Sequence, residues 1–205
     1  MLRNGISEAP LQNKAVISGL PGVRVWGDEV PADLAAALRH HLGGRTEPAV
    51  AFSGGRPVVN VLALSGGGAD GAFGAGLLVG WSAHGGRPEF QVVTGVSAGA
   101  IIAPLAYLGR RHDRDLVKIW TEYNLVDLVV YQGIGGILSG VAAVDTAPLV
   151  QAIAKFVTLR LLREIAAEHA KGRLLLIGTT NLDAQRPVVW NIGAIASSGD
   201  RKSVV

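Results

Sequence analysis

Two apolar runs in this chain each end in glycines and lead into residues that favour a helix. The first run, 58–64, is followed by Gly-Gly-Gly-Ala-Asp-Gly at 66–71; the second, 90–94, is followed by Gly-Val-Ser-Ala-Gly at 95–99. Short apolar runs closed by glycine are typical of buried strands in a parallel sheet. Two successive strand–turn–helix units predict an α/β fold in which both turns lie side by side at the carboxyl edge of the sheet.

The first turn has the composition of an anion-binding loop. Gly66, Gly67 and Gly68 carry no side chains, so their N–H groups can converge at the start of a helix expected over 71–83. Such a loop holds a phosphate or the oxyanion of an acyl-transfer intermediate. The same residues fit the Gly-x-Gly-x-x-Gly dinucleotide fingerprint, which requires an acid at the end of the second strand. Glu89 has the right spacing but precedes that strand, which disfavours this alternative.

The second turn has the pattern of a nucleophile elbow. Ser97 stands between Gly95 and Gly99, after an apolar run and before the helix-forming segment 100–108. Strand, Gly-x-Ser-x-Gly and helix in this order place a serine hydroxyl on a sharp exposed bend. A chain with 28 glycines can contain this pentapeptide by chance. Its coincidence with an anion-binding turn one unit earlier favours the functional interpretation.

Taken together, segments 64–71 and 93–100 resemble the patatin-like phospholipases. The resemblance extends over 57–198 and includes 177–183, which is similar to the late strand and hairpin of that family. It implies a three-layer α/β fold with a mainly parallel sheet, and a serine hydrolase of lipid or acyl esters that needs no cofactor and no metal. It assigns Ser97 as the nucleophile, the oxyanion hole to Gly66, Gly67, Gly68, Ala69, Asp70 and Gly71, and the elbow to Gly95, Val96, Ala98 and Gly99.

The chain departs from the family pattern at two points. Asp70 stands where the family often has a basic residue, and we expect its carboxylate to point to solvent or to cap the helix at Gly71. The family aspartate lies in an Asp-Gly-Gly or Asp-Gly-Ala motif after the hairpin, and none follows Ser97. Asp183 is predicted to be a turn residue and Asp200 lies near the end, so neither is assigned as the catalytic aspartate.

Two expectations follow from this missing motif. Turnover by the chain as given should be weak or absent, because one member of a catalytic unit is lost. The domain should also be incomplete, with an N-terminal extension over 1–56 and the N-terminal part of a patatin-like domain over 57–205.

No other base is predicted for the serine. The histidines are expected to be solvated. The lysines that could act as bases are expected on helix surfaces, and three charged residues of the last long helix are expected to form a solvated face. These residues are His40, His41, His84, His112 and His169; Lys118, Lys155 and Lys171; and Arg163, Glu164 and Glu168.

The amino-acid composition limits the classes of partner that the chain is expected to bind. Of 205 residues, 49% are hydrophobic and 17% charged, which fits a sheet buried by helices, and the net charge of +3 has no cluster that would favour nucleic acid. No run of about 20 apolar residues predicts a transmembrane helix, and the N-terminus lacks the apolar core of a signal peptide. We expect a cytoplasmic location or peripheral membrane contact, and the oligomeric state is left open.

Three functions are therefore weighed. The first is a patatin-like serine acyl hydrolase acting on a lipid or acyl ester. The second is a non-catalytic remnant that binds acyl chains or a partner. The third, lesser alternative is a dinucleotide-binding domain, which leaves the elbow serine without a role.

The remaining pattern places the other elements. Helices are expected over 31–42, 113–123 and 145–157, and a further helix capped by Thr158 should end at Gly172. Strands are expected over 173–180 and 187–192, joined as a hairpin.

Overall fold

The computed structural model describes residues 17, 19–20, 22–30, 51–122, 130–131, 144–145 and 147–199. The helix expected over 31–42, with His40 and His41, lies outside the described residues, as does Asp200.

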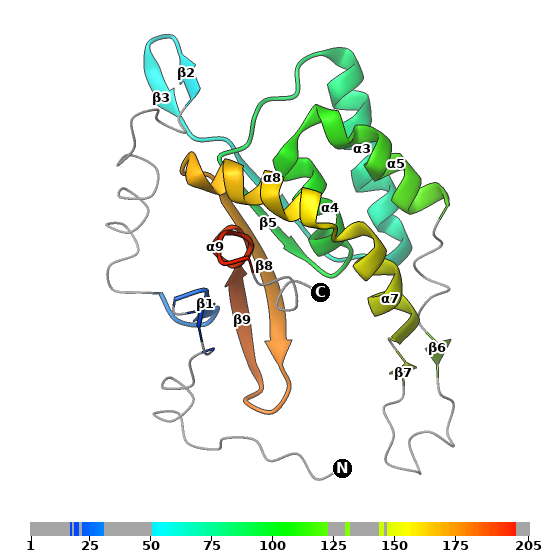
Figure 1. Cartoon of the computed structure of the whole chain (residues 1–205). Coiled ribbons are helices and arrows are strands. Elements are labelled where there is room, and N and C mark those ends of the chain that lie inside the picture. Colours follow the sequence, from blue (N-terminus) through cyan, green and yellow to red (C-terminus); the bar gives the residue numbers. More distant parts are fainter. Residues whose placement is uncertain are drawn as a thin grey trace.

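The central element is a five-stranded sheet in the order β1-β9-β8-β5-β4 (Figure 1). β4 (Val61–Leu64), β5 (Val92–Val96) and β8 (Leu174–Asn181) are parallel neighbours. β9 (Arg186–Asn191) is antiparallel to β8, and β1 (Arg24–Trp26) is antiparallel to β9. All strands of this sheet except β9 thus run in one direction, which confirms the predicted α/β fold with a mostly parallel sheet.

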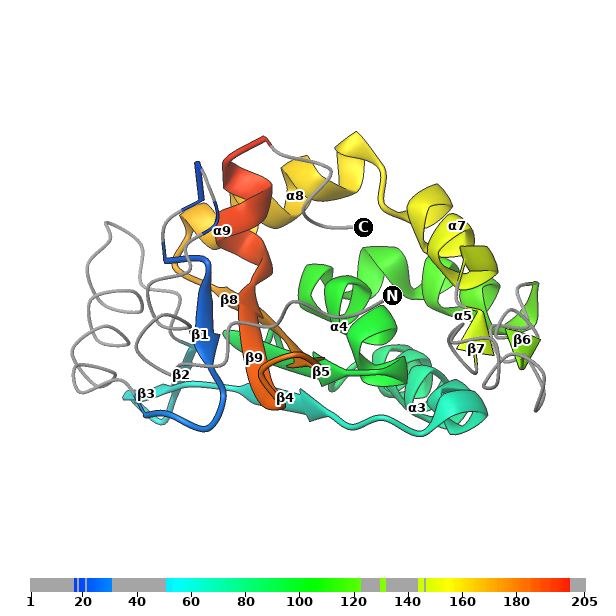
Figure 2. The ribbon, with the colours of Figure 1, turned by 90° about the horizontal axis from the view of Figure 1, so that it is seen from below.

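Helices flank this sheet. They are α3 (Gly71–His84), α4 (Ala98–Leu108), α5 (Asp113–Thr121), α7 (Ala147–Phe156), α8 (Leu159–Ala170) and α9 (Ile192–Ser197). α4 packs against β5 and β8, and α9 packs against β8 and α8. Figure 2 shows α4, α8 and α9 on one side of the sheet. α3 and α5 pack against each other and against α4.

The core lies between these helices and the sheet. Val93 of β5 and Leu175 of β8 are partners in register and are fully buried. Side chains alternate between the faces of a strand, so Val61 and Val96 belong to the other face, where both are more than half exposed. Removing apolar surface from water on the helical side contributes about 25 cal/mol for each Å² buried.

The structure adds a hairpin that the sequence pattern did not predict. β2 (Ala51–Ser53) pairs antiparallel with β3 (Arg56–Val58), and Gly54 and Gly55 join them with φ of 58° and 76°. Two successive residues with positive φ are what a two-residue hairpin turn of type I′ requires. Because this hairpin takes up Val58, β4 begins at Val61 instead of at 58.

Other boundaries shift by a few residues. Short strands β6 (Val130–Tyr131) and β7 (Val144–Asp145) precede α7. The predicted Thr158 cap of α8 is confirmed, since its side chain accepts from the Leu161 N–H. α9 replaces the end of the last expected strand, because the Asn191 side chain accepts from the Ala194 N–H at 3.0 Å and caps a helix there.

Candidate active site

The two glycine turns lie at the carboxyl ends of neighbouring parallel strands, as predicted. Leu64 of β4 is level with Gly95 of β5, so Gly66 comes next to Ser97 two residues further along. A Cβ added at Gly66 would lie 3.0 Å from Ser97 Cβ and 3.6 Å from Ser97 Oγ. Gly66 therefore lies against the serine side chain, and a larger residue there would be tight against Ser97 Cβ.

Ser97 has a strained backbone and an exposed side chain. It joins β5 to α4 with φ of 54° and ψ of −123°, a combination that non-glycine residues rarely adopt. Holding a residue in such a region costs roughly 1–3 kcal/mol. Among the described residues, none makes a hydrogen bond to Ser97 Oγ.

The glycines on either side of Ser97 are required by close backbone contacts. A Cβ at Gly95 would lie 2.6 Å from the carbonyl carbon of Gly99. A Cβ at Gly99 would lie 2.7 Å from Leu64 C and from Ser65 O. The Gly-x-Ser-x-Gly pattern is thus a packing requirement: α4 begins directly against the ends of β4 and β5. Between them, Val96 ends β5 with its side chain half exposed, and Ala98 begins α4 as a buried residue.

The first turn presents bare backbone to solvent. Gly68 has φ of 56°, a conformation that favours glycine, and begins the short 3-10 helix η1 (Gly68–Asp70). Gly67 O accepts a hydrogen bond from the Asp70 N–H at 3.0 Å, which closes the turn. Within the described part of the chain, the N–H groups of Gly66, Gly67 and Gly68 have no hydrogen-bond acceptor. Ala69 is exposed on η1.

Asp70 lies at the start of α3. Its side chain is exposed and makes no capping hydrogen bond with that helix. Of its two predicted roles, the structure contains the solvent-exposed carboxylate and not the cap.

Trp120 lies where the two turns meet, and only its place on the apolar side of α5 could have pointed to it from the sequence. Gly71, the first residue of α3, lies so close to the Trp120 ring that an added Cβ would be 2.5 Å from Trp120 Cζ2. The same point is 3.0 Å from Ala98 Cβ, directly after the serine. One indole ring therefore packs at the junction of both turns, which requires glycine at position 71.

Charged side chains gather at the opposite, amino edge of the sheet. Arg173, immediately before β8, is buried: its Nη1 lies 2.8 Å from Glu168 Oε2 and its Nε donates to Phe90 O at 2.9 Å. Arg87, also buried, donates to Asp113 Oδ1 at 2.7 Å and to Ala106 O at 3.1 Å. Burial alone would raise the pKa of Glu168, but hydrogen bonds from Lys171 and Arg173 outweigh it and hold that pKa below its ordinary value.

Two predictions about solvated charges were wrong. His112 is buried, with Nδ1 2.8 Å from Asp115 Oδ2 and Nε2 2.8 Å from Glu164 Oε2. The hydrogen bond with His112 lowers the pKa of Glu164. Glu168 was expected on a solvated face, yet its side chain is 7% exposed. His112, in the short 3-10 helix η2 (Arg110–His112), meets Glu164 of α8, and Glu168 of α8 meets Arg173 beyond the end of that helix. A single-helix pattern cannot show contacts between elements.

No general base is brought to the serine by the described residues. His84 is exposed at the end of α3, and the half-buried His169 has Nδ1 3.2 Å from Arg173 O at the amino edge. Lys118, Lys155 and Lys171 are exposed on their helices or helix ends, as predicted. Asp183 lies in the β8–β9 turn, where its N–H donates to Asn181 Oδ1 at 3.0 Å.

The acidic residue that dinucleotide binding would require is not at the glycine turn. Glu89 lies at the amino edge, where its Oε1 is 3.5 Å from Arg173 Nη1 and its backbone carbonyl accepts from Asn60 Nδ2 at 3.1 Å. The glycine turn lies at the carboxyl edge, so Glu89 is on the wrong side of the sheet to bind a ribose held there. At the end of β5 the chain has Val96 and Ser97 instead of an acid.

Comparison with models of protein families gives a match. A family model described as patatin-like phospholipase matches residues 62–198, a range that contains both turns. Comparisons with curated proteins and with solved structures give no match. No helix within the described residues has the length and apolar character needed to cross a membrane.

Proposed function

Since this chain belongs to the patatin-like phospholipase family, a family of lipid acyl hydrolases, we propose that it is a serine hydrolase in which Ser97 attacks the carbonyl carbon of a lipid ester. The observation that supports this most strongly is the contact between Gly66 and the strained, exposed Ser97. Strain at an exposed hydroxyl beside open backbone amides is the arrangement that acyl transfer uses.

The reaction divides into two steps. A bond forms between Ser97 Oγ and the ester carbon, and the carbonyl oxygen becomes an oxyanion that the amides of Gly67 and Gly68 stabilise. The intermediate collapses, and the ester's alcohol leaves with the proton that the serine gave up. Water then attacks the acyl-serine, which releases the fatty acid and restores Ser97.

We expect turnover to be slow. A serine hydroxyl needs a base to accept its proton, and the described residues supply none within hydrogen-bond distance of Ser97 Oγ. This absence favours one second candidate, a non-catalytic domain that retains the fold and binds acyl chains. The dinucleotide-binding alternative receives no such support.

Two measurements on the full chain separate these functions. Hydrolysis of a short p-nitrophenyl ester is compared between wild type and Ser97→Ala; equal rates would remove Ser97 from the mechanism. A fluorophosphonate is then tested by intact mass, because it reacts with an activated serine. Labelling at Ser97 supports the hydrolase, and failure to label wild type supports the non-catalytic alternative.

A further inference from the structure

We propose that the outer face of α3 is a docking surface for a lipid bilayer. The surface consists of Phe73, Leu77 and Trp81, which are 77%, 59% and 39% exposed. Positions i, i+4 and i+8 share one side of a helix, so these side chains form a stripe about 12 Å long. The inference rests on the proposed function, because it describes how a lipid ester would reach Ser97.

Apart from Leu78, α3 buries only small residues, and its two aromatic side chains lie outside. Its buried positions are Gly71, Ala75, Leu78 and Ser82. Large side chains are normally placed on the buried side and polar ones outside, and α3 has the largest ones outside. The helix contains no Asp, Glu, Lys or Arg, so nothing charged interrupts the apolar surface.

The stripe also continues to the candidate active site. α3 begins at Gly71, which directly follows the glycine turn, and Phe73 lies in the first turn of the helix. A bilayer in contact with Phe73 would therefore lie next to the Gly66–Gly68 amides and Ser97. The stripe would hold the site at the surface where its substrate is found.

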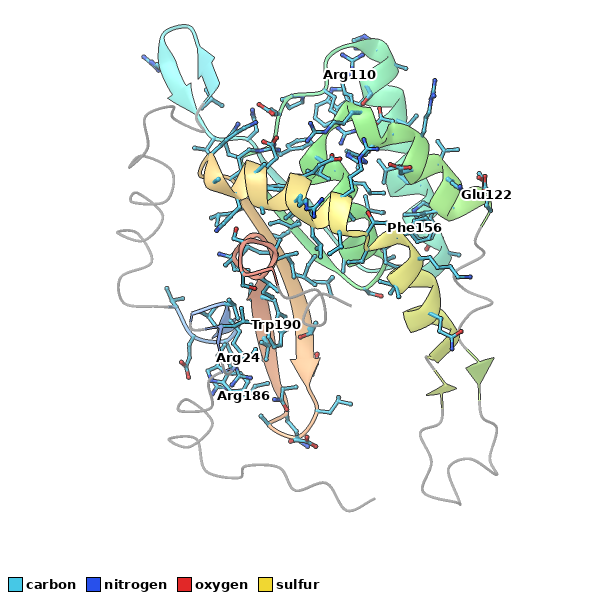
Figure 3. The ribbon with its side chains drawn as sticks, viewed as in Figure 1. Arg24, Arg110, Glu122, Phe156, Arg186 and Trp190 are labelled. Atoms are coloured by element: carbon cyan, nitrogen blue, oxygen red, sulfur yellow. The ribbon has the colours of Figure 1, made fainter. Side chains whose placement is uncertain are left out.

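Charge beside the stripe favours an anionic lipid surface. α5 packs against α3, and Val117 of α5 is 45% exposed. Arg114 and Lys118 are exposed on the same helix, and Arg110 is exposed directly before it. The acids nearby are Asp70 at the start of α3, Asp113 and Asp115 of α5, which pair with Arg87 and His112, and Glu122, whose Oε2 is 3.6 Å from Lys118 Nζ. Figure 3 shows Arg110 and Glu122 at opposite ends of α5.

A second copy of the chain fits this surface less well. A two-fold interface brings the same patch of both copies together, so Arg114 and Lys118 of one copy would approach those of the other. Like charges at an interface disfavour association. A bilayer with anionic headgroups instead places negative charge at that border, where each basic residue strengthens binding.

The test uses the full chain carrying Ser97→Ala, so that vesicles are not consumed. Binding to phosphatidylcholine vesicles, with and without phosphatidylglycerol, is measured by flotation. Leu77→Ser is compared with the matched control Leu182→Ser, since Leu182 is 62% exposed in the β8–β9 turn. We expect Leu77→Ser to lower the partition coefficient about tenfold or more and Leu182→Ser to leave it unchanged.

Further variants identify the parts of the surface. Phe73→Ser should lose binding to a similar extent, and Arg114→Gln with Lys118→Gln should weaken binding only to vesicles that contain phosphatidylglycerol. Equal thermal unfolding midpoints will show that each variant is folded. Binding that is absent in the starting protein, or equal in Leu77→Ser and Leu182→Ser, would overturn the proposal. So would a dimer without vesicle binding that Leu77→Ser dissociates.

Failure here and failure of the proposed function give different results. Fluorophosphonate labelling of Ser97 without vesicle binding would remove the docking surface and keep the hydrolase. Vesicle binding without labelling would keep the surface and remove the nucleophile.

Discussion

The two edges of the sheet are built on opposite principles. At the carboxyl edge, Ser97 and Gly66–Gly68 are exposed, the backbone of Ser97 is strained, and none of the described residues gives the serine a charged partner. At the amino edge, Arg87 and Arg173 are buried, and the structure gives them carboxylate and carbonyl acceptors. Satisfied buried charges make one edge rigid, and open donors leave the other ready for a ligand. The comparison indicates that stability and chemistry are separated along α4, which begins at Ala98 and reaches the amino edge at Leu108.

We expect the largest loss of stability from a substitution of Arg173 at the amino edge. Arg173→Met removes the buried partner of Glu168 Oε2, leaves Arg111 and Lys171 on Oε1, and frees two carbonyls, Phe90 O and Tyr107 O. Breaking a buried pair costs about 3–5 kcal/mol, so urea unfolding should shift by that much. The control is Arg160→Met, which removes an exposed pair with Glu164 and should cost less than about 1 kcal/mol. Equal losses for the two variants would show that burial at the amino edge is not what matters.

A double-mutant cycle tests the junction of the two turns. Gly71→Ala places a methyl group against the Trp120 ring and should destabilise by roughly 1–3 kcal/mol. Trp120→Phe removes the ring atoms that would clash, so the methyl should cost much less in that background. The measurements are the free energy of unfolding and the fluorophosphonate labelling rate. Additive effects would mean that Trp120 does not constrain position 71.

Relief of the backbone strain at the carboxyl edge should increase the stability of the chain, whereas the substitutions above decrease it. Ser97→Gly relieves the positive φ of 54° and should raise the free energy of unfolding by about 1 kcal/mol while abolishing labelling. Ser97→Ala keeps the strained backbone and serves as the control, with little gain in stability. A loss of stability in Ser97→Gly would show that the bend is not strained.

Acid should weaken the amino edge first. The pKa values of Glu164 and Glu168 are lowered in the folded chain, so their contribution is complete above the ordinary value of 4.5. Below it the unfolded chain binds protons more readily, and stability falls as pH decreases toward the lowered values. Glu168→Gln should flatten this decline in urea unfolding below that pH. An unchanged slope would show that Glu168 does not contribute.

The predictability of the two edges differs for the same physical reason. The carboxyl edge was predicted because the residues that form it are close together in the sequence. Gly95, Ser97 and Gly99 lie within five positions, and each glycine is required by a close backbone contact. The amino edge was not predicted because its partners are far apart in sequence, such as Arg173 and Tyr107, which are 66 positions apart. A helix pattern read alone therefore placed Glu168 in solvent.

Short elements also escaped prediction. The β2–β3 hairpin depends on two left-handed glycines, Gly54 and Gly55, in a segment with little apolar alternation. α9 follows β9 directly, because Asn191 is both the last residue of the strand and the N-cap of the helix. The helix pattern around Trp120 indicates that this side chain points inward. It does not indicate that Gly71 and Ala98 lie nearby.

The most direct test of the central claim is a crystal structure of the full chain after reaction with a fluorophosphonate. We predict phosphorus bonded to Ser97 Oγ and its phosphoryl oxygen about 3 Å from the amide nitrogens of Gly67 and Gly68. A phosphoryl oxygen turned away from those amides, or a modification at any residue other than Ser97, would contradict the account.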